Sequence, residues 1–204
     1  MFTKSTEYLG ATADPTEPAK HPFPEFAIAG RSNVGKSTLI NALVGARIAR
    51  TSKTPGRTQL LHFVCYRKNA VLVDLPGLGF AKAPKNVQRK IENLALNTLR
   101  FRESLHGLLL LVDIRRTPGD IERQILDHAL QTGLKVLVVA TKCDQISKHQ
   151  RKPAINKLVA WSGLGRHAAI AASSNSGEGM DAIHHQLEKW AKTALPPSDE
   201  GDSI

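Results

Sequence analysis

The sequence predicts an α/β protein with a mainly parallel β-sheet and helices on both of its faces. Short apolar runs alternate with longer amphipathic stretches along the 204-residue chain. Several runs, such as residues 108–112, contain no polar residue, which is typical of strands buried on both faces of a parallel sheet. Glycines 30 and 35 frame the junction between the first apolar run and the first amphipathic stretch, where a sharp backbone turn is expected.

Six strands are expected. The apolar runs that define them are residues 26–29, 60–66, 70–74, 107–112, 134–140 and 167–172. Only Arg67, Lys68 and Asn69 separate the second run from the third, and so short a connection cannot make a parallel crossover. These two strands must therefore form an antiparallel hairpin, so one strand of the sheet runs against the others.

Helices are expected between and after these strands. They cover residues 36–44, 87–101, a stretch that begins near 118, 148–161 and 178–193. Residues 117–120 offer an N-cap, a proline at the first helical position and an acid in the first turn. Pro153 interrupts the fourth helix, so the sequence leaves its start open. The large apolar side chains at helical spacing in the last helix are expected in the core: Met180, Ile183, Leu187 and Trp190.

Composition predicts one globular domain over residues 23–195. Residues 1–22 and 196–204 are rich in Pro, Asp, Glu and Ser, and we expect them to be mobile tails. No apolar stretch is long enough to span a membrane, and the first residues lack the apolar core of a signal peptide. The two cysteines are too few for a disulfide framework or a zinc site. We therefore expect a cytoplasmic monomer with reduced cysteines and no membrane contact.

Residues 30–37 read GRSNVGKS, which is the phosphate-binding pattern G-x-x-x-x-G-K-S between a predicted strand and a predicted helix. Gly30 and Gly35 allow the backbone to curl so that successive amides point at phosphate oxygens. Lys36 is expected to reach the β- and γ-phosphates, and the hydroxyl of Ser37 to bind Mg²⁺. We assign Lys36 to the reacting phosphate.

Two further segments belong with the phosphates. Asp74 ends an apolar strand in the stretch VLVDLPG and can hold Mg²⁺ through water, while the amide of Gly77 can sense the γ-phosphate. We therefore also assign Gly77 to the reacting phosphate. Thr58 lies in the loop before the second strand and can give Mg²⁺ a second hydroxyl.

The stretch TKCD at 141–144 follows the fifth apolar run and predicts guanine specificity. The carboxylate of Asp144 can accept hydrogen bonds from both N1–H and the exocyclic amine of guanine. Adenine lacks that pair of donors, so the carboxylate would leave polar groups unpaired against ATP. The aliphatic stem of Lys142 can lie along the base, and residues 172–174 can present a backbone amide to the guanine carbonyl.

These motifs, in this order, make the chain resemble the EngB (YihA/YsxC) family of bacterial GTPases over about residues 20–192. The stretches that carry the resemblance are GRSNVGKSTLINAL at 30–43, SKTPGRTQLLHF at 52–63, DLPGLGFAK at 74–82, TKCDQIS at 141–147 and SSNSGEG at 173–179. The resemblance implies a Ras-like P-loop GTPase fold and GTP hydrolysis with Mg²⁺. It also implies a role in assembly of the large ribosomal subunit, linked to normal cell division and septation.

The resemblance carries a set of nucleotide contacts onto this sequence. They are Gly30, Arg31, Ser32, Asn33, Val34, Gly35, Lys36, Ser37, Gly56, Arg57, Thr58, Gln59, Leu60, Asp74, Leu75, Pro76, Gly77, Thr141, Lys142, Cys143, Asp144, Ala172, Ser173 and Ser174. The expected metal ligands are Ser37, Thr58 and Asp74. Thr141 stands where GTPases usually have Asn, and Leu78 stands where many carry a water-orienting Gln. Asn33 occupies the position that in several related GTPases helps to bind K⁺.

Charge indicates an anionic macromolecular partner. The net charge is +10, and two stretches around the nucleotide loops hold cations without an acid. These cations are Arg47, Arg50, Lys53 and Arg57 in residues 47–57, and Lys82, Lys85, Arg89 and Lys90 in residues 82–90. A basic surface that changes with the γ-phosphate would couple GTP to binding of structured ribosomal RNA in the large subunit or its precursor.

Two other functions fit parts of this pattern. A regulatory GTP switch for a cell-division protein, without RNA contact, would need the nucleotide motifs but not the basic loops. A P-loop kinase or ATPase would need the phosphate-binding stretch alone, and Asp144 counts against it. The basic loops favour the ribosomal assembly factor over the GTP switch without RNA contact.

Overall fold

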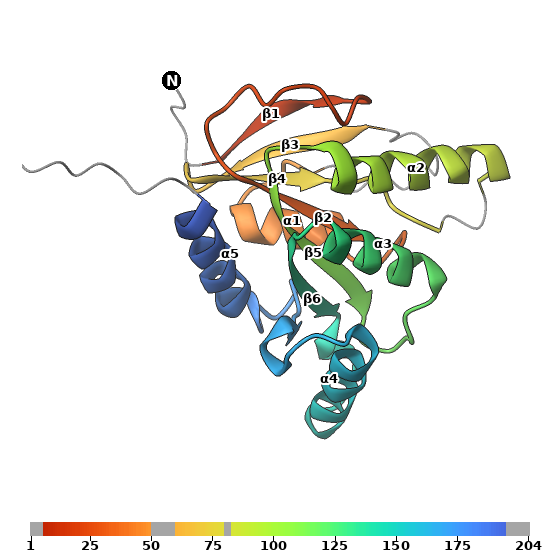
Figure 1. Ribbon diagram of the computed structural model, residues 1–204. Coiled ribbons are helices and arrows are strands. Elements are labelled where there is room, and N and C mark those ends of the chain that lie inside the picture. The colour runs from red at the N-terminus through yellow and green to blue at the C-terminus, as the bar shows by residue number, and fades with distance from the viewer. Residues whose placement is uncertain (1–5, 50–59, 80–82, 195–204) are drawn as a thin grey trace, which may run out of the picture.

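The structure is a computed structural model that describes residues 6–49, 60–79 and 83–194. In these residues one mixed sheet of seven strands runs through the molecule, with helices against both faces (Figure 1). Its strands are β1 (Thr6–Thr12), β2 (Glu25–Gly30), β3 (Leu61–Tyr66), β4 (Ala70–Asp74), β5 (Leu105–Asp113), β6 (Lys135–Thr141) and β7 (Ala169–Ala171).

The strands lie in the order β1-β3-β4-β2-β5-β6-β7. Pairing is parallel from β4 through β2, β5 and β6 to β7. β3 is antiparallel to both of its neighbours, β1 and β4, so in the described chain it alone opposes the other strands. The mainly parallel sheet and the predicted β3–β4 hairpin are therefore confirmed.

The N-terminal segment corrects the expected strand count from six to seven. Residues 6–12, which we expected within a mobile tail, form β1 and pair with β3 from Thr6↔Tyr66 to Thr12↔Leu61. A register shift between Tyr8 and Gly10 interrupts the ladder. The strand is partly exposed along its length, so it lacks the apolar run by which the other strands were recognised.

The helices of the described chain match the predicted ones, except that one begins later than expected. They are α1 (Lys36–Val44), α2 (Lys85–Phe101), α3 (Asp120–Gln131), α4 (Lys148–Ser162) and α5 (Met180–Ala194), with short 3₁₀ turns at Cys143–Gln145 and Arg166–Ala168. The late helix is α3: its N-cap is Gly119, so Thr117 and Pro118 lie before the helix. Gly45 ends α1 in the left-handed conformation, with φ of 66°. Ser147 and Gln150 start α4 with a capping box, so Pro153 lies inside the helix and does not interrupt it.

Two apolar layers form the core. On one face of the sheet, α1 and α5 pack against β2, β5 and β6. On the other face, α2 and α3 cover the centre of the sheet, and α4 covers β6 and β7 (Figure 1). As predicted, the large apolar side chains of α5 belong to the first layer: Met180, Ile183, Leu187 and Trp190.

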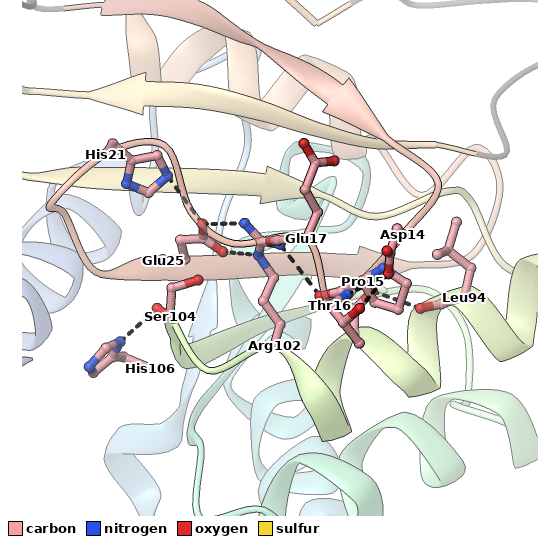
Figure 2. A network of polar contacts seen from close by, with 11 residues as sticks. Asp14, Pro15, Thr16, Glu17, His21, Glu25, Leu94, Arg102, Ser104 and His106 are labelled. Atoms are coloured by element: carbon pink, nitrogen blue, oxygen red, sulfur yellow. Dashed lines mark hydrogen bonds and ion pairs between the residues drawn. The ribbon is translucent and has the colours of Figure 1, made fainter.

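A buried ion pair fixes the connection between β1 and β2. Glu25 and Arg102 are 0% and 7% exposed and form a two-pronged pair, with 2.7 Å between Arg102 Nη2 and Glu25 Oε1. Arg102 Nη1 also donates to the carbonyl of Glu17 at 3.0 Å, as Figure 2 shows. Burial pushes the pKa of Glu25 upward, but the contacts with Arg102 and His21 outweigh it and lower that pKa. The pair therefore ties residues 13–25 to the end of α2.

No helix in the described ranges combines the length and the apolar character that crossing a bilayer requires.

Candidate functional site

The loops that carry the sequence motifs meet along one edge of the sheet. Each follows a parallel strand: residues 30–36 follow β2, 74–79 follow β4, 141–145 follow β6 and 172–179 follow β7. The carboxyl ends of parallel strands lie on the same edge, which is where α/β folds bind ligands. Segments far apart in the sequence are thereby brought together, as predicted.

The loop after β2 can adopt its path only with small residues at defined positions. A Cβ on Gly30 would lie 2.9 Å from both the carbonyl oxygen of Leu111 and Cγ1 of Val34, so a side chain does not fit there. Asn33 and Gly35 have φ values of 64° and 103°, in the left-handed region that turns amides inward. Gly35 precedes α1 without a side-chain cap, which leaves the first amides of the helix available for an anion.

Lys36 and Asp74 bring opposite charges to the head of this loop. The ammonium of Lys36, the first residue of α1, contacts Oδ1 of Asp74 at the end of β4. Both side chains are only 12% exposed. Ser37 is the next residue of α1 and is partly buried, so a hydroxyl follows directly on this cation and carboxylate. This donor set fits Mg²⁺ beside phosphate groups.

Backbone hydrogen bonds hold the loop after β4 against the phosphate-binding loop. The amide of Ser32 donates to the carbonyl of Leu78 at 2.8 Å, and the amide of Leu78 donates to the carbonyl of Gly30 at 3.1 Å. Gly77 lies close to the phosphate-binding loop: a Cβ added at Gly77 would be 3.5 Å from Cα of Ser32. The Leu78 side chain is 0% exposed and packs in the core under α2 and α3. Leu78 is therefore a core residue, a role that its sequence position did not reveal.

Thr141 links the loop after β6 (the base loop, residues 141–145) to the loop after β2 (the phosphate loop, residues 30–36). Its Oγ1 donates to the carbonyl of Val34 at 2.7 Å, and the Thr141 residue is only 5% exposed. Thr141 stands where GTPases usually have Asn, so the side-chain amide of that Asn is missing here. The hydroxyl makes a bond directly between the two loops, so this link is present in the protein.

Lys142 braces the same two loops. Its ammonium donates to the carbonyl of Asn33 at 2.7 Å and lies 3.1 Å from Oδ2 of Asp113. Asp113 ends β5, is 6% exposed and receives two further hydrogen bonds from the guanidinium of Arg115. The Arg115 contact, with help from Lys142, holds the pKa of Asp113 far below its usual range against the opposing effect of burial. Sequence reasoning missed Asp113, although an acid at the end of an apolar strand was a usable signal.

Asp144 is exposed at the mouth of the site. A side-chain hydrogen bond from Ser173 lowers the pKa of Asp144, with a smaller contribution from Asn175. Ser173 is 1% exposed, and its Oγ also accepts the amides of Asn175 and Ser176 at 3.3 and 3.2 Å. The buried hydroxyl thus donates its one proton to the carboxylate that is expected to read the base, and keeps that carboxylate charged.

A close backbone approach holds the last loop in place. The amide of Cys143 donates to the carbonyl of Ala172 at 3.2 Å, which joins the loops after β6 and β7. A Cβ on Gly179 would lie 2.1 Å from the carbonyl oxygen of Ala171, and Gly179 has φ of 76°. Only glycine fits this position, a role that the sequence pattern alone did not assign.

Part of the predicted site cannot be placed. Gly56, Arg57, Thr58 and Gln59 lie outside the described residues, and with them the predicted hydroxyl ligand of Thr58. Leu60 is described and is 38% exposed just before β3. The other described members of the predicted set occupy the four loops of the site: residues 30–37, 74–77, 141–144 and 172–174.

The fold and this arrangement of loops place the chain in the class of P-loop GTPases, which hydrolyse GTP to GDP and phosphate. Residues 25–142 match a family of proteins described as 50S ribosome-binding GTPases. The chain also matches proteins named probable GTP-binding protein EngB. It is 42% identical to the one from Geobacter metallireducens, over 98% of each chain. It is 41% identical to the one from Syntrophotalea carbinolica, over 92% of this chain and 91% of the relative.

The chain therefore belongs to the EngB family of GTP-binding proteins. A crystal structure of a probable GTP-binding protein EngB superimposes with a TM-score of 0.71 and 25% identity, over 83% of this chain and 99% of that one. The family prediction made from the motifs, the Ras-like fold and the GTPase activity are confirmed.

Proposed function

We propose that this chain is an assembly factor for the large ribosomal subunit that acts as a cytoplasmic monomer and is needed for normal septation. One observation carries the proposal. The first turns of α2 present Lys85, Arg89 and Lys90, all exposed, shortly after the loop that contacts the phosphate-binding loop. Cations at that place can bind ribosomal RNA in a way that depends on the γ-phosphate. The description of the matching family as 50S ribosome-binding supports this partner.

The nucleotide would be held from both ends. The amides of residues 30–37 and the ammonium of Lys36 would bind phosphate oxygens, and Ser37, Asp74 and Thr58 would hold Mg²⁺. When bound, this ion neutralises negative charge on the β- and γ-phosphates. The amide of Gly77 would register the γ-phosphate. Asp144 would accept the guanine N–H groups.

Hydrolysis by the isolated protein should be slow. Leu78 is buried in the core and carries no polar atom, so it cannot align the attacking water. A K⁺ ion near Asn33 would supply positive charge to the reacting phosphate. Asn33 is exposed, and its backbone has a left-handed conformation. Turnover in KCl should then exceed turnover in NaCl at equal ionic strength, and Asn33→Ala should remove the difference. Equal rates in both salts would exclude the monovalent ion and leave the ribosomal particle as the activator.

Co-sedimentation with large-subunit precursors tests the proposed function. The protein with a non-hydrolysable GTP analogue should bind more tightly than with GDP, and binding should weaken steeply with salt. Reversal of Lys85, Arg89 and Lys90 to Glu should abolish the GTP-dependent part and leave nucleotide affinity unchanged. The matched control reverses three exposed lysines away from α2: Lys68, Lys189 and Lys192.

The outcome separates the two remaining functions. If the α2 variant sediments like the control variant, α2 does not contact the particle. A GTP switch for a cell-division protein, without RNA contact, would then be the better description. If the α2 variant alone loses GTP-dependent sedimentation, the assembly factor is supported.

A further inference from the structure

A second basic region lies away from the start of α2, which is the proposed GTP-dependent surface. Residues 145–177 contain no Asp or Glu, whereas the chain as a whole has 18 acids in 204 residues. The same stretch holds the cations Lys148, Arg151, Lys152, Lys157 and Arg166. Four of these five cations lie on α4, which packs against β6 and β7 at the opposite end of the layer from α2 (Figure 1). This charge bias is therefore separate from the basic start of α2.

The charges of α4 oppose its own helix dipole. Acids near a helix N-terminus stabilise it and cations there destabilise it. α3, the neighbouring helix of the same layer, follows this rule with Asp120 and Glu122 in its first turn. α4 begins with Lys148 and has no acid in its first turn. A charge pattern that works against the stability of its helix indicates a use other than folding.

The cations of α4 are mostly left without an internal partner. Arg151 pairs with Glu178, and its side chain is 16% exposed. Lys148, Lys152 and Lys157 are exposed, and no ion pair of theirs occurs among the described residues. Lys148 and Lys157 are nine residues apart on one helix, which is a separation of about 14 Å along its axis. Nine residues are also about two and a half turns, so Lys148 and Lys157 lie on the two flanks of the exposed side of α4, a spread that suits phosphates on either side of an RNA groove.

The uncharged residues exposed on α4 indicate whether its cations suit a nucleic acid or an acidic protein. The other exposed residues of the helix are small or polar: His149, Gln150, Pro153, Asn156 and Ala160. Protein interfaces are rich in aromatic side chains and poor in lysine, whereas contacts to nucleic-acid backbones depend on lysine and arginine and need no apolar anchor. The surface therefore fits a nucleic-acid backbone better than an acidic protein.

We propose that the α4 face, defined as Lys148, His149, Lys152 and Lys157, binds the phosphate backbone of double-helical RNA in both nucleotide states. α4 follows the loop that reads guanine, and guanine is common to GTP and GDP. Its packing partners are β6 and β7 rather than the loop after β4 that adjoins the phosphates. The proposal deepens the proposed function, since the RNA would belong to the same particle. The α4 face supplies a constant contact, and α2 adds the GTP-dependent one.

Fluorescence anisotropy with a labelled 20-base-pair RNA duplex tests the α4 face directly. The full chain is loaded with GDP or with a non-hydrolysable GTP analogue and titrated at several KCl concentrations. Reversal of Lys148, Lys152 and Lys157 to Glu should weaken binding at least tenfold in both states. It should also lower the slope of log affinity against log salt by about 0.9 for each phosphate that is no longer neutralised, by the value for duplex DNA. The control reversal of Lys68, Lys189 and Lys192 changes the net charge equally and should leave affinity within about twofold of wild type.

Stability separates this effect from damage to the fold. Because Lys148→Glu places an acid at the start of α4, the thermal midpoint of the α4 variant should be equal to or higher than that of wild type. Its GDP affinity should also be unchanged. Loss of RNA binding together with unchanged or raised stability supports the α4 face. If Lys148→Gln, Lys152→Gln and Lys157→Gln together leave RNA binding unchanged, the proposal fails.

Three further results would overturn the proposal: α4 and control variants that bind alike, a loss seen only with the GTP analogue, or competition by poly-glutamate as effective as that by RNA. The proposed function can fail independently. If precursor particles bind equally well with GTP and GDP while the α4 variant still loses duplex binding, only the GTP-dependent role of α2 is disproved.

Discussion

The two halves of the nucleotide site are built differently. The phosphate half, residues 30–37 and 74–78, depends on backbone amides, on Gly30 where no side chain fits, and on hydrogen bonds between main chains. The guanine half, residues 141–144 and 172–179, also has main-chain contacts, but two buried side-chain hydroxyls, those of Thr141 and Ser173, hold its backbone in place. Every nucleotide has phosphates, so we propose that the first half sets affinity for the class and that the second half chooses the base.

Replacing Asp144 with Asn should separate the two halves most strongly. The amide puts a donor opposite the guanine exocyclic amine, so GTP and GDP affinity should fall on the order of 10²–10⁴-fold. Xanthine nucleotides, which carry an oxygen there, should gain affinity. Titration with fluorescent guanine and xanthine nucleotides measures both changes. Asp127→Asn, at a half-exposed side chain of α3, is the control and should bind GDP normally. Undiminished GTP binding by the Asp144 variant would disprove its assignment to the base.

Leu78→Gln tests whether the phosphate half can be given a water-orienting side chain. The structure predicts that it cannot, because the new amide would be buried among the core residues under α2 and α3. Loss of apolar burial and an unpaired amide should together cost about 3 kcal/mol of unfolding free energy. For a chain of this size that lowers Tm by roughly 6–12 °C. Hydrolysis should not become faster. Leu78→Met keeps the volume and should be nearly neutral, and a rise in turnover with Gln would contradict the core assignment.

Gly179→Ala should damage the guanine half through the backbone. The added Cβ would lie 2.1 Å from the carbonyl oxygen of Ala171, and the φ of 76° is also unfavourable for alanine. The combined strain should cost about 1–3 kcal/mol of stability and move the loop that carries Ser173. Gly165→Ala is the matched control, since nothing lies within 4 Å of its Cβ position. Thermal unfolding and GDP titration of both variants measure the effect. Equal Tm values would show that the loop can move enough to accept the added methyl group.

The sequence predicted the phosphate half more fully than the guanine half. A phosphate loop needs particular residues at fixed spacing, because glycines and the lysine act within one continuous segment. The positions of Lys36 and Asp74 therefore followed from the motif and from the strand that precedes each. The guanine half is assembled from contacts between segments. The donation from Thr141 to Val34 and the position of Gly179 against Ala171 depend on packing that no local pattern records.

The N-terminal segment was mispredicted for a related reason. β1 is an edge strand with exposed positions, so it shows neither a continuous apolar run nor a strict alternation. Pairing with β3 and the anchor from Arg102 to Glu17 hold this segment in place. Both partners are far away in the sequence, and Arg102 gave no local sign that it would be buried against Glu25.

Thr141→Val should give the smallest effect and tests whether the two halves act together. The substitution keeps the shape of the side chain but removes the hydroxyl that donates to the carbonyl of Val34 at 2.7 Å. An unpaired buried carbonyl costs about 1 kcal/mol or somewhat more. We expect Tm to fall by roughly 2–4 °C and GDP affinity to fall several-fold, because the guanine loop would no longer be tied to the phosphate loop. Thr141→Ser retains the donor and should behave like wild type. If the Val variant loses stability but binds GDP normally, the hydroxyl serves the core alone, and the two halves are positioned independently by the strands that precede them.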